Sequence, residues 1–241
     1  MHFKKINIVN FVFVLIVLSF FSCSKEVEKD SYRYDIADFD SLSVQSVFQI
    51  HLIQDSVNYV KISAFEKNVP NIETDVKDKT LFLKDKTSPT WTRPQKNTPV
   101  LYVHLKNLKQ IYLFASGSLV SDNELQGESL CLITKARYND IELNLRYQSF
   151  CYWNNHPNGG LLNLKGVVQS LTVWNSSLNT LDARDLKSEY VMIDTQSKAD
   201  SYAFCTEELH TNIRSIGNIY IFGNPISIDT LKTGSGNLFF K

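Results

Sequence analysis

An internal repeat of about 20 residues is the feature that most constrains the fold of this chain. When the segments from residue 111 onward are aligned, apolar residues fall into two columns. The first column contains Ile111, Leu130, Phe150, Leu171, Tyr190, Leu209 and Leu231. The second column contains Ile141, Leu162, Leu181, Tyr202, Ile219 and Leu238. Each repeat therefore supplies two short apolar segments at matching positions.

The spacing inside these segments indicates strands. Members of the second column have an apolar or small companion two residues later, such as Leu143, Leu164 and Ile221. A period of two buries one face of a strand. A single unit of two short strands cannot bury that face, whereas a stack of units can. The repeat therefore favours an all-β solenoid, and a β-sandwich of hairpins is the alternative because strand signals at 8–12-residue intervals also fit it.

The N-terminal part of the same domain has strand-like alternation with less regular spacing. Segments such as 48–52, 81–83 and 100–105 alternate, and a polar, Pro-containing loop spans 87–98. Terminal repeats are often atypical because they must close an open edge. We therefore expect one domain over 34–241, with an irregular N-terminal part over 34–108 and regular repeats over 109–241.

The first 22 residues are predicted to be a signal peptide. Lys4 and Lys5 precede an apolar run over 6–21, which is short for a membrane-spanning helix and suits a secretory signal. The run ends in Ser19-Phe20-Phe21-Ser22-Cys23, which resembles a bacterial lipobox although Phe20 replaces the usual Leu. That resemblance implies cleavage before Cys23, acylation of its thiol and attachment to a membrane by the lipid. Residues 23–33 are predicted to be a charged, flexible tether.

The charge balance argues against one class of partner. Lys and Arg number 25, and so do Asp and Glu. A neutral chain lacks the basic surface that nucleic-acid binding requires, so no nucleic-acid partner is expected. Besides Cys23, the chain has Cys131, Cys151 and Cys205, with no Cys-x-x-Cys motif. Buried, unpaired cysteines are the expected state of these three.

No catalytic, metal or cofactor motif is found in the sequence. Gly-x-Ser-x-Gly, His-Glu-x-x-His and Walker patterns are missing, and the histidines lack metal-ligand spacing. Two acid pairs, Asp182 with Asp185 and Asp140 with Glu142, have the residue types that polysaccharide cleavage uses. Such pairs are also common on solvated faces, so an enzyme acting on polysaccharides is only the alternative function.

One column of aromatic and aliphatic residues lies three positions after the first apolar column. It contains Phe114, Ile133, Trp153, Trp174 and Ile193. If the apolar column points inward, this column points outward, and the two tryptophans stack on neighbouring coils as a contact site for a glycan or a surface protein. If the chain bends there, the same residues point inward and belong to the core. Trp153, Trp174 and Phe114 are therefore the candidate contact residues.

The C-terminal segments resemble the head GIN domain family. The resemblance rests on Ile216 to Pro225, I-G-N-I-Y-I-F-G-N-P, followed by Gly234-Ser235-Gly236-Asn237-Leu238. In the middle repeats the Gly-Ser-Gly slots hold other residues, such as Asn175-Ser176-Ser177. The resemblance implies a right-handed β-helix and an adhesin-like lipoprotein of the bacterial outer membrane, on its periplasmic or cell-surface face. The expected function is non-enzymatic binding; a structural envelope role is the further alternative.

Overall fold

The computed structural model describes residues 30–64, 66–87, 98–154 and 156–241. The predicted signal peptide and the predicted lipidation at Cys23 lie outside these residues. In the described part, the chain forms strands and one short 3₁₀ helix, η1 (Glu66–Asn71), and no helix there is long and apolar enough to cross a membrane.

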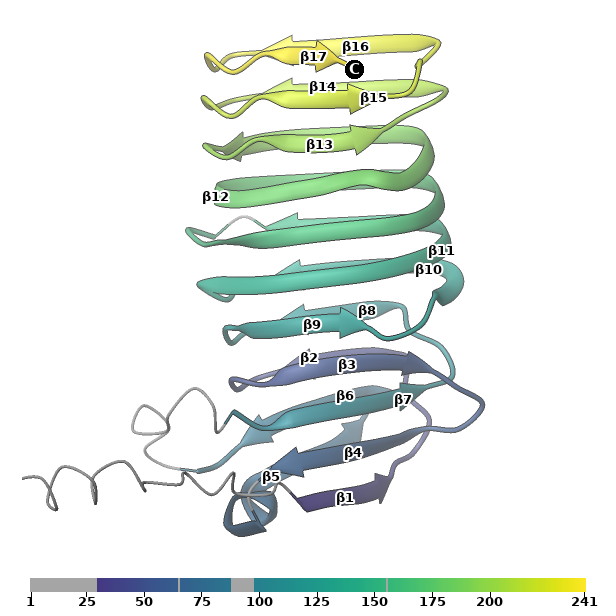
Figure 1. Ribbon diagram of the computed structural model, residues 1–241, viewed down its shortest axis with the longest axis vertical. Helices are drawn as coiled ribbons and strands as arrows, with labels where there is room; N and C mark the ends of the chain where they lie inside the picture. Colours follow the sequence, from purple (N-terminus) through teal and green to yellow (C-terminus); the bar gives the residue numbers. More distant parts are fainter. Residues whose placement is uncertain (1–29, 65, 88–97, 155) are drawn as a thin grey trace, which may run out of the picture.

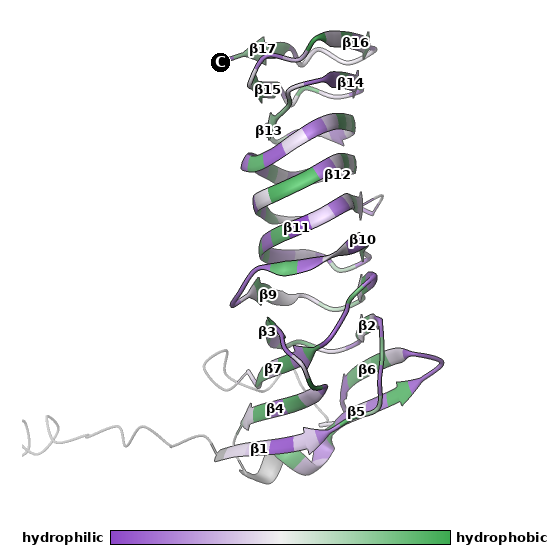
Figure 2. Cartoon of the chain, turned by 90° about the vertical axis from the view of Figure 1, so that its right-hand side faces the viewer, coloured by the Kyte–Doolittle hydropathy of each residue, from purple (hydrophilic) through white to green (hydrophobic). Residues whose placement is uncertain are grey.

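The strands stack as the coils of a β-solenoid (Figure 1). Viewed from the side, the stack is narrower, so each coil is flattened into two faces (Figure 2). Strands of one face are β6 (Thr80–Asp85), β2 (Ser41–Val44), β8 (Gln110–Leu113), β14 (Glu208–Ile213) and β16 (Ser227–Lys232). Strands of the other face are β7 (Val100–Leu105), β3 (Gln49–Gln54), β9 (Gly117–Ser121), β13 (Ser201–Phe204), β15 (Ile219–Phe222) and β17 (Leu238–Phe240).

Three long strands continue around the edge between the two faces. They are β10 (Leu125–Thr134), β11 (Tyr138–Asn154) and β12 (Gly159–Ser197). Neighbouring coils pair in parallel, as the register of β11 on β12 shows. The β-solenoid prediction is confirmed, and the β-sandwich alternative does not describe the structure.

The coils at the N-terminal end are not stacked in chain order. The coil of β2 and β3 lies between the coil of β6 and β7 and the coil of β8 and β9. Antiparallel strands then close this end: β4 (Tyr59–Ala64) pairs with β7, β1 (Asp30–Asp35) pairs with β4, and β5 (Ile72–Lys77) pairs with β6. Antiparallel strands cover edges that a parallel coil would leave open.

Inward-facing residues of successive coils form apolar ladders, as the sequence predicted for much of the chain. Leu130, Phe150 and Leu171 align and are buried. Ile141 aligns with Leu162, and Ile219 with Leu238. Because each ladder buries apolar side chains from both neighbouring coils, the coils stabilise one another.

Three members of the predicted first column are misplaced or shifted. Ile111 aligns with Leu132 and not with Leu130. Tyr190 points outward with 42% exposure, and its neighbour Val191 aligns with Leu209 in the core. Leu231 is 58% exposed and aligns with Asn212. Coil lengths differ by one or two residues, and a shift of one residue turns a side chain to the opposite face of the sheet.

The second column contains one similar error. Tyr202 aligns with Asp182 on the outer face, while the inward position belongs to Ser201, which aligns with Leu181. Ser201 also aligns with Ile219. The apolar character of Tyr202 misled the alignment, because an exposed aromatic ladder and a buried one have the same sequence period.

Glycines at the last corner are required by close approach and not by a left-handed backbone. A side chain at Gly236 would overlap the carbonyl oxygen of Gly217, and one at Gly234 would overlap that of Ser215. Neither Gly234 nor Gly236 has a positive φ. Successive turns therefore pack backbone on backbone, and Gly234 and Gly236 leave the space for that packing.

Buried asparagines fill the same corner in the middle coils. Asn154 Nδ2 donates to Asn158 Oδ1 at 2.7 Å, and Asn175 Nδ2 donates to the Asn179 carbonyl oxygen at 2.8 Å. Asn179 Nδ2 donates to the hydroxyl of buried Tyr152 at 2.9 Å. These side chains satisfy polar groups inside turns that lack the Gly-Ser-Gly pattern.

Candidate binding site

A stripe of aromatic and aliphatic side chains runs along the outside of the face that contains β8. Ile133 aligns with Tyr112 on one side and Trp153 on the other, and Trp153 aligns with Trp174. Phe114 follows the end of β8 and is 46% exposed. We call Tyr112, Phe114, Ile133, Trp153 and Trp174 the aromatic stripe.

The tryptophans of the aromatic stripe point to solvent. Trp153 is 42% exposed and Trp174 is half-buried, while Tyr152 and Val173 beside them are buried. Alternation along the strands therefore continues through this region without a bend that would turn the indoles inward. The predicted outward position of Ile193 is wrong, because this side chain is fully buried. Sequence reasoning also missed Tyr112, which takes the ladder position expected for Phe114.

Ring stacking sets the shape of this surface. The centroids of Trp153 and Trp174 lie 4.6 Å apart at an interplanar angle of 29°. The separation is close to the distance between coils, so the rings stack along the solenoid axis. Each ring covers one face of the other. Tyr112 and Phe114 also stack, at 6.4 Å, with Lys135 Nζ 5.6 Å from the Phe114 centroid.

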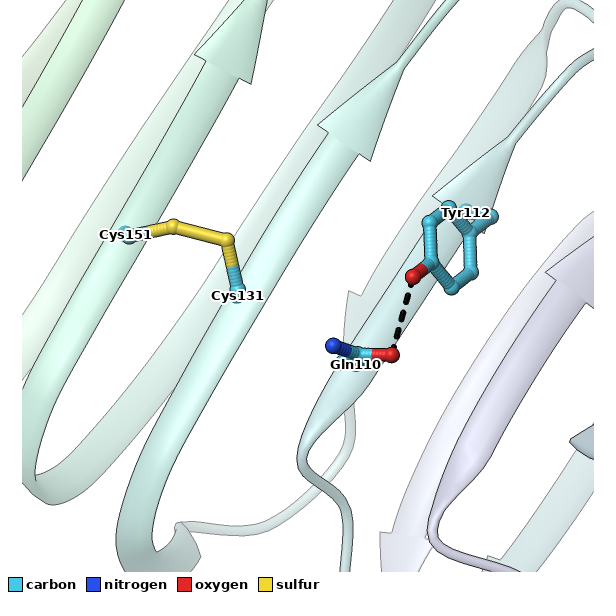
Figure 3. Close-up of a disulfide and its surroundings, with 4 residues drawn as sticks. All are labelled: Gln110, Tyr112, Cys131 and Cys151. Atoms are coloured by element: carbon cyan, nitrogen blue, oxygen red, sulfur yellow. Dashed lines mark hydrogen bonds between the residues drawn. A yellow bond between two sulfur atoms is a disulfide. The ribbon is translucent and has the colours of Figure 1, made fainter. Parts of the chain in front are cut away.

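A disulfide ties together two coils that carry the aromatic stripe. Cys131 and Cys151 align on β10 and β11 and are bonded to each other, with Cα atoms 4.5 Å apart (Figure 3). Gln110 and Tyr112 lie on the next coil, where the Tyr112 hydroxyl donates to Gln110 Oε1 at 2.9 Å. The expectation that these two cysteines are buried and unpaired is wrong: their side chains are half-buried on the outer face, where they meet.

The third cysteine is buried and unpaired, as expected from the sequence. Cys205 is free and fully buried. Its thiol lies 3.4 Å from the Glu189 carbonyl oxygen and 3.3 Å from the Glu208 carbonyl oxygen. Burial raises the pKa of this thiol, which disfavours the reactive thiolate. Cys205 is therefore a core residue.

A second aromatic ladder lies on the opposite face and was missed in the sequence. Tyr202 stacks on Tyr220, and Tyr220 on Phe239, each with centroids 5.1 Å apart. The Arg184 guanidinium lies 4.6 Å above the Tyr202 ring, and Lys241 Nζ lies 5.5 Å from the Tyr220 centroid. Cations thus cover ring faces here. The signal was present in the sequence, but Tyr202 was assigned to the core.

In each carboxylate pair considered for catalysis, one member forms a surface ion pair. Arg184 Nε lies 2.8 Å from Asp182 Oδ1, and Asp185 is exposed. Lys165 Nζ lies 3.0 Å from Glu142 Oε1 on the neighbouring coil, and Asp140 is exposed. Asp182 and Glu142 are thus held by cations on an open face, which is the ordinary arrangement of exposed charges.

An open depression of about 450 Å³ follows the narrow edge of the solenoid between the two faces. Its apolar wall includes Val167, Val168 and Phe204, and Lys187 Nζ lies 3.7 Å from the Phe204 centroid. Glu189 is the one carboxylate among its lining residues. Glycoside hydrolysis uses two carboxyl groups across a cleft, so this depression does not have the donor set of that chemistry.

Three described histidines pair with carboxylates, His210 with both Glu208 and Asp229. His51 Nδ1 lies 2.7 Å from Asp122, and His104 Nδ1 lies 3.0 Å from Asp55. The described residues include no group of three or more His, Cys, Asp or Glu side chains that could hold a metal ion.

Comparison with known proteins agrees with this architecture. The model of the family described as "Putative auto-transporter adhesin, head GIN domain" matches residues 38–225. The chain belongs to this family. The predicted membership in the head GIN domain family is thereby confirmed. A search of curated proteins found no match.

Solved structures share the fold of this head GIN domain at low sequence identity. A putative adhesin from Bacteroides fragilis has a TM-score of 0.77 and 20% identity, over 90% of this chain and 98% of that one. From Parabacteroides distasonis, a putative lipid binding protein has a TM-score of 0.66 and 16% identity, with the same coverage. A putative adhesin from the same species has a TM-score of 0.65 and 15% identity, again over 90% and 98%.

Proposed function

We propose that this head GIN domain protein is an envelope-anchored, non-enzymatic binding protein that contacts a macromolecular partner through the aromatic stripe. The observation that carries the proposal is the outward position of the stacked Trp153 and Trp174 on a rigid ladder of coils. Apolar side chains that neighbour one another on a folded surface, with no protein group over them, are typical of interaction sites. Large aromatic residues dominate the energy of such interfaces.

The stacking favours a protein partner over a sugar. A pyranose ring packs on a free aromatic face, whereas stacking takes up one face of each indole. An apolar or aromatic surface patch can pack on ring edges. Lys135 flanks the aromatic stripe beside Phe114. A partner with acidic groups beside an apolar patch would therefore be complementary to this surface. The adhesin description of the family fits contact with a surface protein.

Anchoring is proposed to occur through a lipid at Cys23, which places the protein on the bacterial outer membrane. The disulfide between Cys131 and Cys151 supports an envelope location, because disulfides persist in oxidising compartments and are rare in the cytosol. A Cys23→Ser variant is expected to lose lipid labelling and to leave the membrane fraction. Continued acylation of that variant would disprove the anchor.

Binding screens with a matched pair of variants test the contact surface. Trp153→Ala/Trp174→Ala removes the stacked pair of the aromatic stripe. Tyr202→Ala/Tyr220→Ala is the control, because it removes a stacked pair of outward rings from the opposite face. The proteins are screened against matrix proteins, envelope proteins and a glycan array, with circular dichroism as the check of folding.

The first variant is expected to lose most binding to a protein ligand, and the control is expected to retain it. Equal binding by the wild type and the tryptophan variant would refute the aromatic stripe as the site. Loss of binding confined to glycan ligands would replace the protein partner with a saccharide.

A further inference from the structure

The two ends of the solenoid differ. At the N-terminal end, the antiparallel strand β1 covers β4, and its sequence Asp-Ser-Tyr-Arg-Tyr-Asp has charges on both sides of the tyrosines. At the other end, β16 pairs with β14 and β17 pairs with β15, and neither has a second strand partner among the described residues (Figure 1). The C-terminal coil therefore presents two unpaired strand edges, which are sites for strand addition.

Apolar side chains are exposed on this coil at core positions. Ile228 aligns with fully buried Leu209 and is itself 50% exposed. Phe240 aligns with fully buried Ile221 and is also 50% exposed. Ile226, just before β16, is 80% exposed. These residues would continue the core into another layer if one were present.

The charged residues of the last coil do not shield its edge. Asp229 Oδ2 lies 3.3 Å from His210 on the preceding coil. Lys232 Nζ donates to Asn237 Oδ1 within the same coil at 2.7 Å. Lys241 Nζ lies over the ring of Tyr220, also on the preceding coil. Exposed edges are commonly protected by a lysine that projects across them. Here all three charged side chains have partners within their own chain.

We propose that two copies of this protein pair end to end through the C-terminal coil. The other end of a second copy is a poorer match for these apolar side chains, since its outermost strand β1 has the charged residues Asp30, Arg33 and Asp35. Two C-terminal ends are related by a two-fold axis across the solenoid, which places the terminal strands of the copies antiparallel. This pairing is closed and isologous, so it yields a dimer and not a fibre.

The size of the end predicts a weak dimer. Strands about 20 Å long in two layers about 10 Å apart give an end face of roughly 400 Å² per copy with side chains included. The total, about 800 Å², is below the roughly 1,200–2,000 Å² of stable complexes. A dissociation constant in the micromolar range or weaker is therefore expected. Many copies on one surface would strengthen the contact by multivalency.

The position of this end gives the dimer a role that rests on the proposed anchoring. β1, which contains residues 30–33 of the predicted tether, lies at one end of the solenoid, and the C-terminal coil lies at the opposite end (Figure 1). A lipid at Cys23 would place the C-terminal coil farthest from the membrane. End-to-end pairing would then join proteins on two opposed membranes, which is homotypic adhesion between cells.

Analytical ultracentrifugation of the soluble fragment 24–241, which omits the predicted lipid anchor, tests the pairing. This chain retains every residue of the buried core, which spans Phe39 to Ile221. Ile226→Lys/Ile228→Lys places charge on the edge at positions already half exposed or more, so it is expected to fold. Leu178→Lys is the matched control, since Leu178 is 62% exposed on β12, away from the last coil.

Wild type and Leu178→Lys are expected to show a concentration-dependent dimer, and the double variant to dimerise at least tenfold more weakly. Hydrogen exchange at β16 of the wild type should slow as the protein concentration rises and dimer forms. A wild type that stays monomeric at its highest soluble concentration overturns the proposal. A double variant that dimerises like the wild type overturns it as well.

The same variants separate this proposal from the function of the aromatic stripe. Trp153→Ala/Trp174→Ala should dimerise normally and fail to bind a heterologous protein, while the edge variant should bind that protein and fail to dimerise. If both activities disappear together in either variant, the two surfaces are not independent and the end-to-end assignment is wrong.

Discussion

Removal of the disulfide should destabilise the middle of the solenoid by a magnitude that the structure defines. The bond joins Cys131 and Cys151, which are 20 residues apart in sequence and lie on neighbouring coils. A closed loop of that length restricts the unfolded chain by about 3 kcal/mol in the chain-entropy model. Cys131→Ser/Cys151→Ser should therefore lower the free energy of unfolding by about this amount. Serine suits both positions, because the cysteine side chains are half exposed.

Thermal unfolding followed by circular dichroism measures the effect. For a chain of this size, a loss of about 3 kcal/mol lowers Tm by roughly 6–12 °C. A reductant provides the internal control: it should lower the Tm of the wild type to that of the variant and leave the variant unchanged. Cys205 is buried and free in both proteins, so it does not contribute to the difference.

The reasoning fails if the oxidised wild type and the variant unfold at the same temperature. It also fails if the reductant lowers the Tm of the variant as much as that of the wild type, because the effect would then come from another source. A loss much greater than about 3 kcal/mol would show that the bond does more than restrict the unfolded chain, for instance by coupling the cooperative unfolding of neighbouring coils.

Two further predictions concern the C-terminal coils. Gly236→Ala should lower the free energy of unfolding by about 1–3 kcal/mol, because its methyl group would overlap a backbone carbonyl of the preceding coil. Gly159→Ala is the control, and its loss should be smaller because the nearest atom to its methyl group lies at 3.8 Å. Urea unfolding compares the two variants. Hydrogen bonds to Glu208 and Asp229 raise the pKa of His210 above its ordinary 6.5. The contribution of protonated His210 to the stability of the fold is therefore complete below pH 6.5 and is lost as pH rises through the raised pKa. Hydrogen exchange at β16, corrected for intrinsic rates, should accelerate over that pH range, and His210→Asn should abolish the change.

The period of the repeat was enough to predict the solenoid, because apolar ladders such as Ile141 and Leu162 are local consequences of composition and spacing. It was not enough to fix the register throughout. Tyr190 and Val191 are adjacent and both apolar in character, and a coil one residue longer decides which of them faces inward. Turn length is determined by backbone packing between coils, which the sequence period does not encode.

The disulfide had a signal in the sequence that could have identified it. Cys131 and Cys151 are separated by one repeat, so residues one coil apart should align, and they do. The outward position of Trp153 and Trp174 was left open, since periodicity alone does not say which face of a strand is buried. The neighbouring buried residues Tyr152 and Val173 decide that question in the structure.

The N-terminal coil order was beyond sequence reasoning for a different reason. β3 pairs with β7, about 50 residues later in the chain, and with β9, which is later still. Pairing over such separations leaves no short-range periodic signal. The same limit applies to the capping strand β1, whose partner β4 is antiparallel while the regular coils are parallel.

This coil order also determines when the protein can begin to fold. The coil of β2 and β3 has both edges open until β6 and β7 pair on one side and β8 and β9 on the other. These pairings close long loops of chain, which is entropically expensive, so we expect them to limit the folding rate. Once it is complete, each later coil needs only its predecessor as a template. A chain delivered N-terminus first should therefore wait for residue 121 and then lengthen rapidly, one coil at a time.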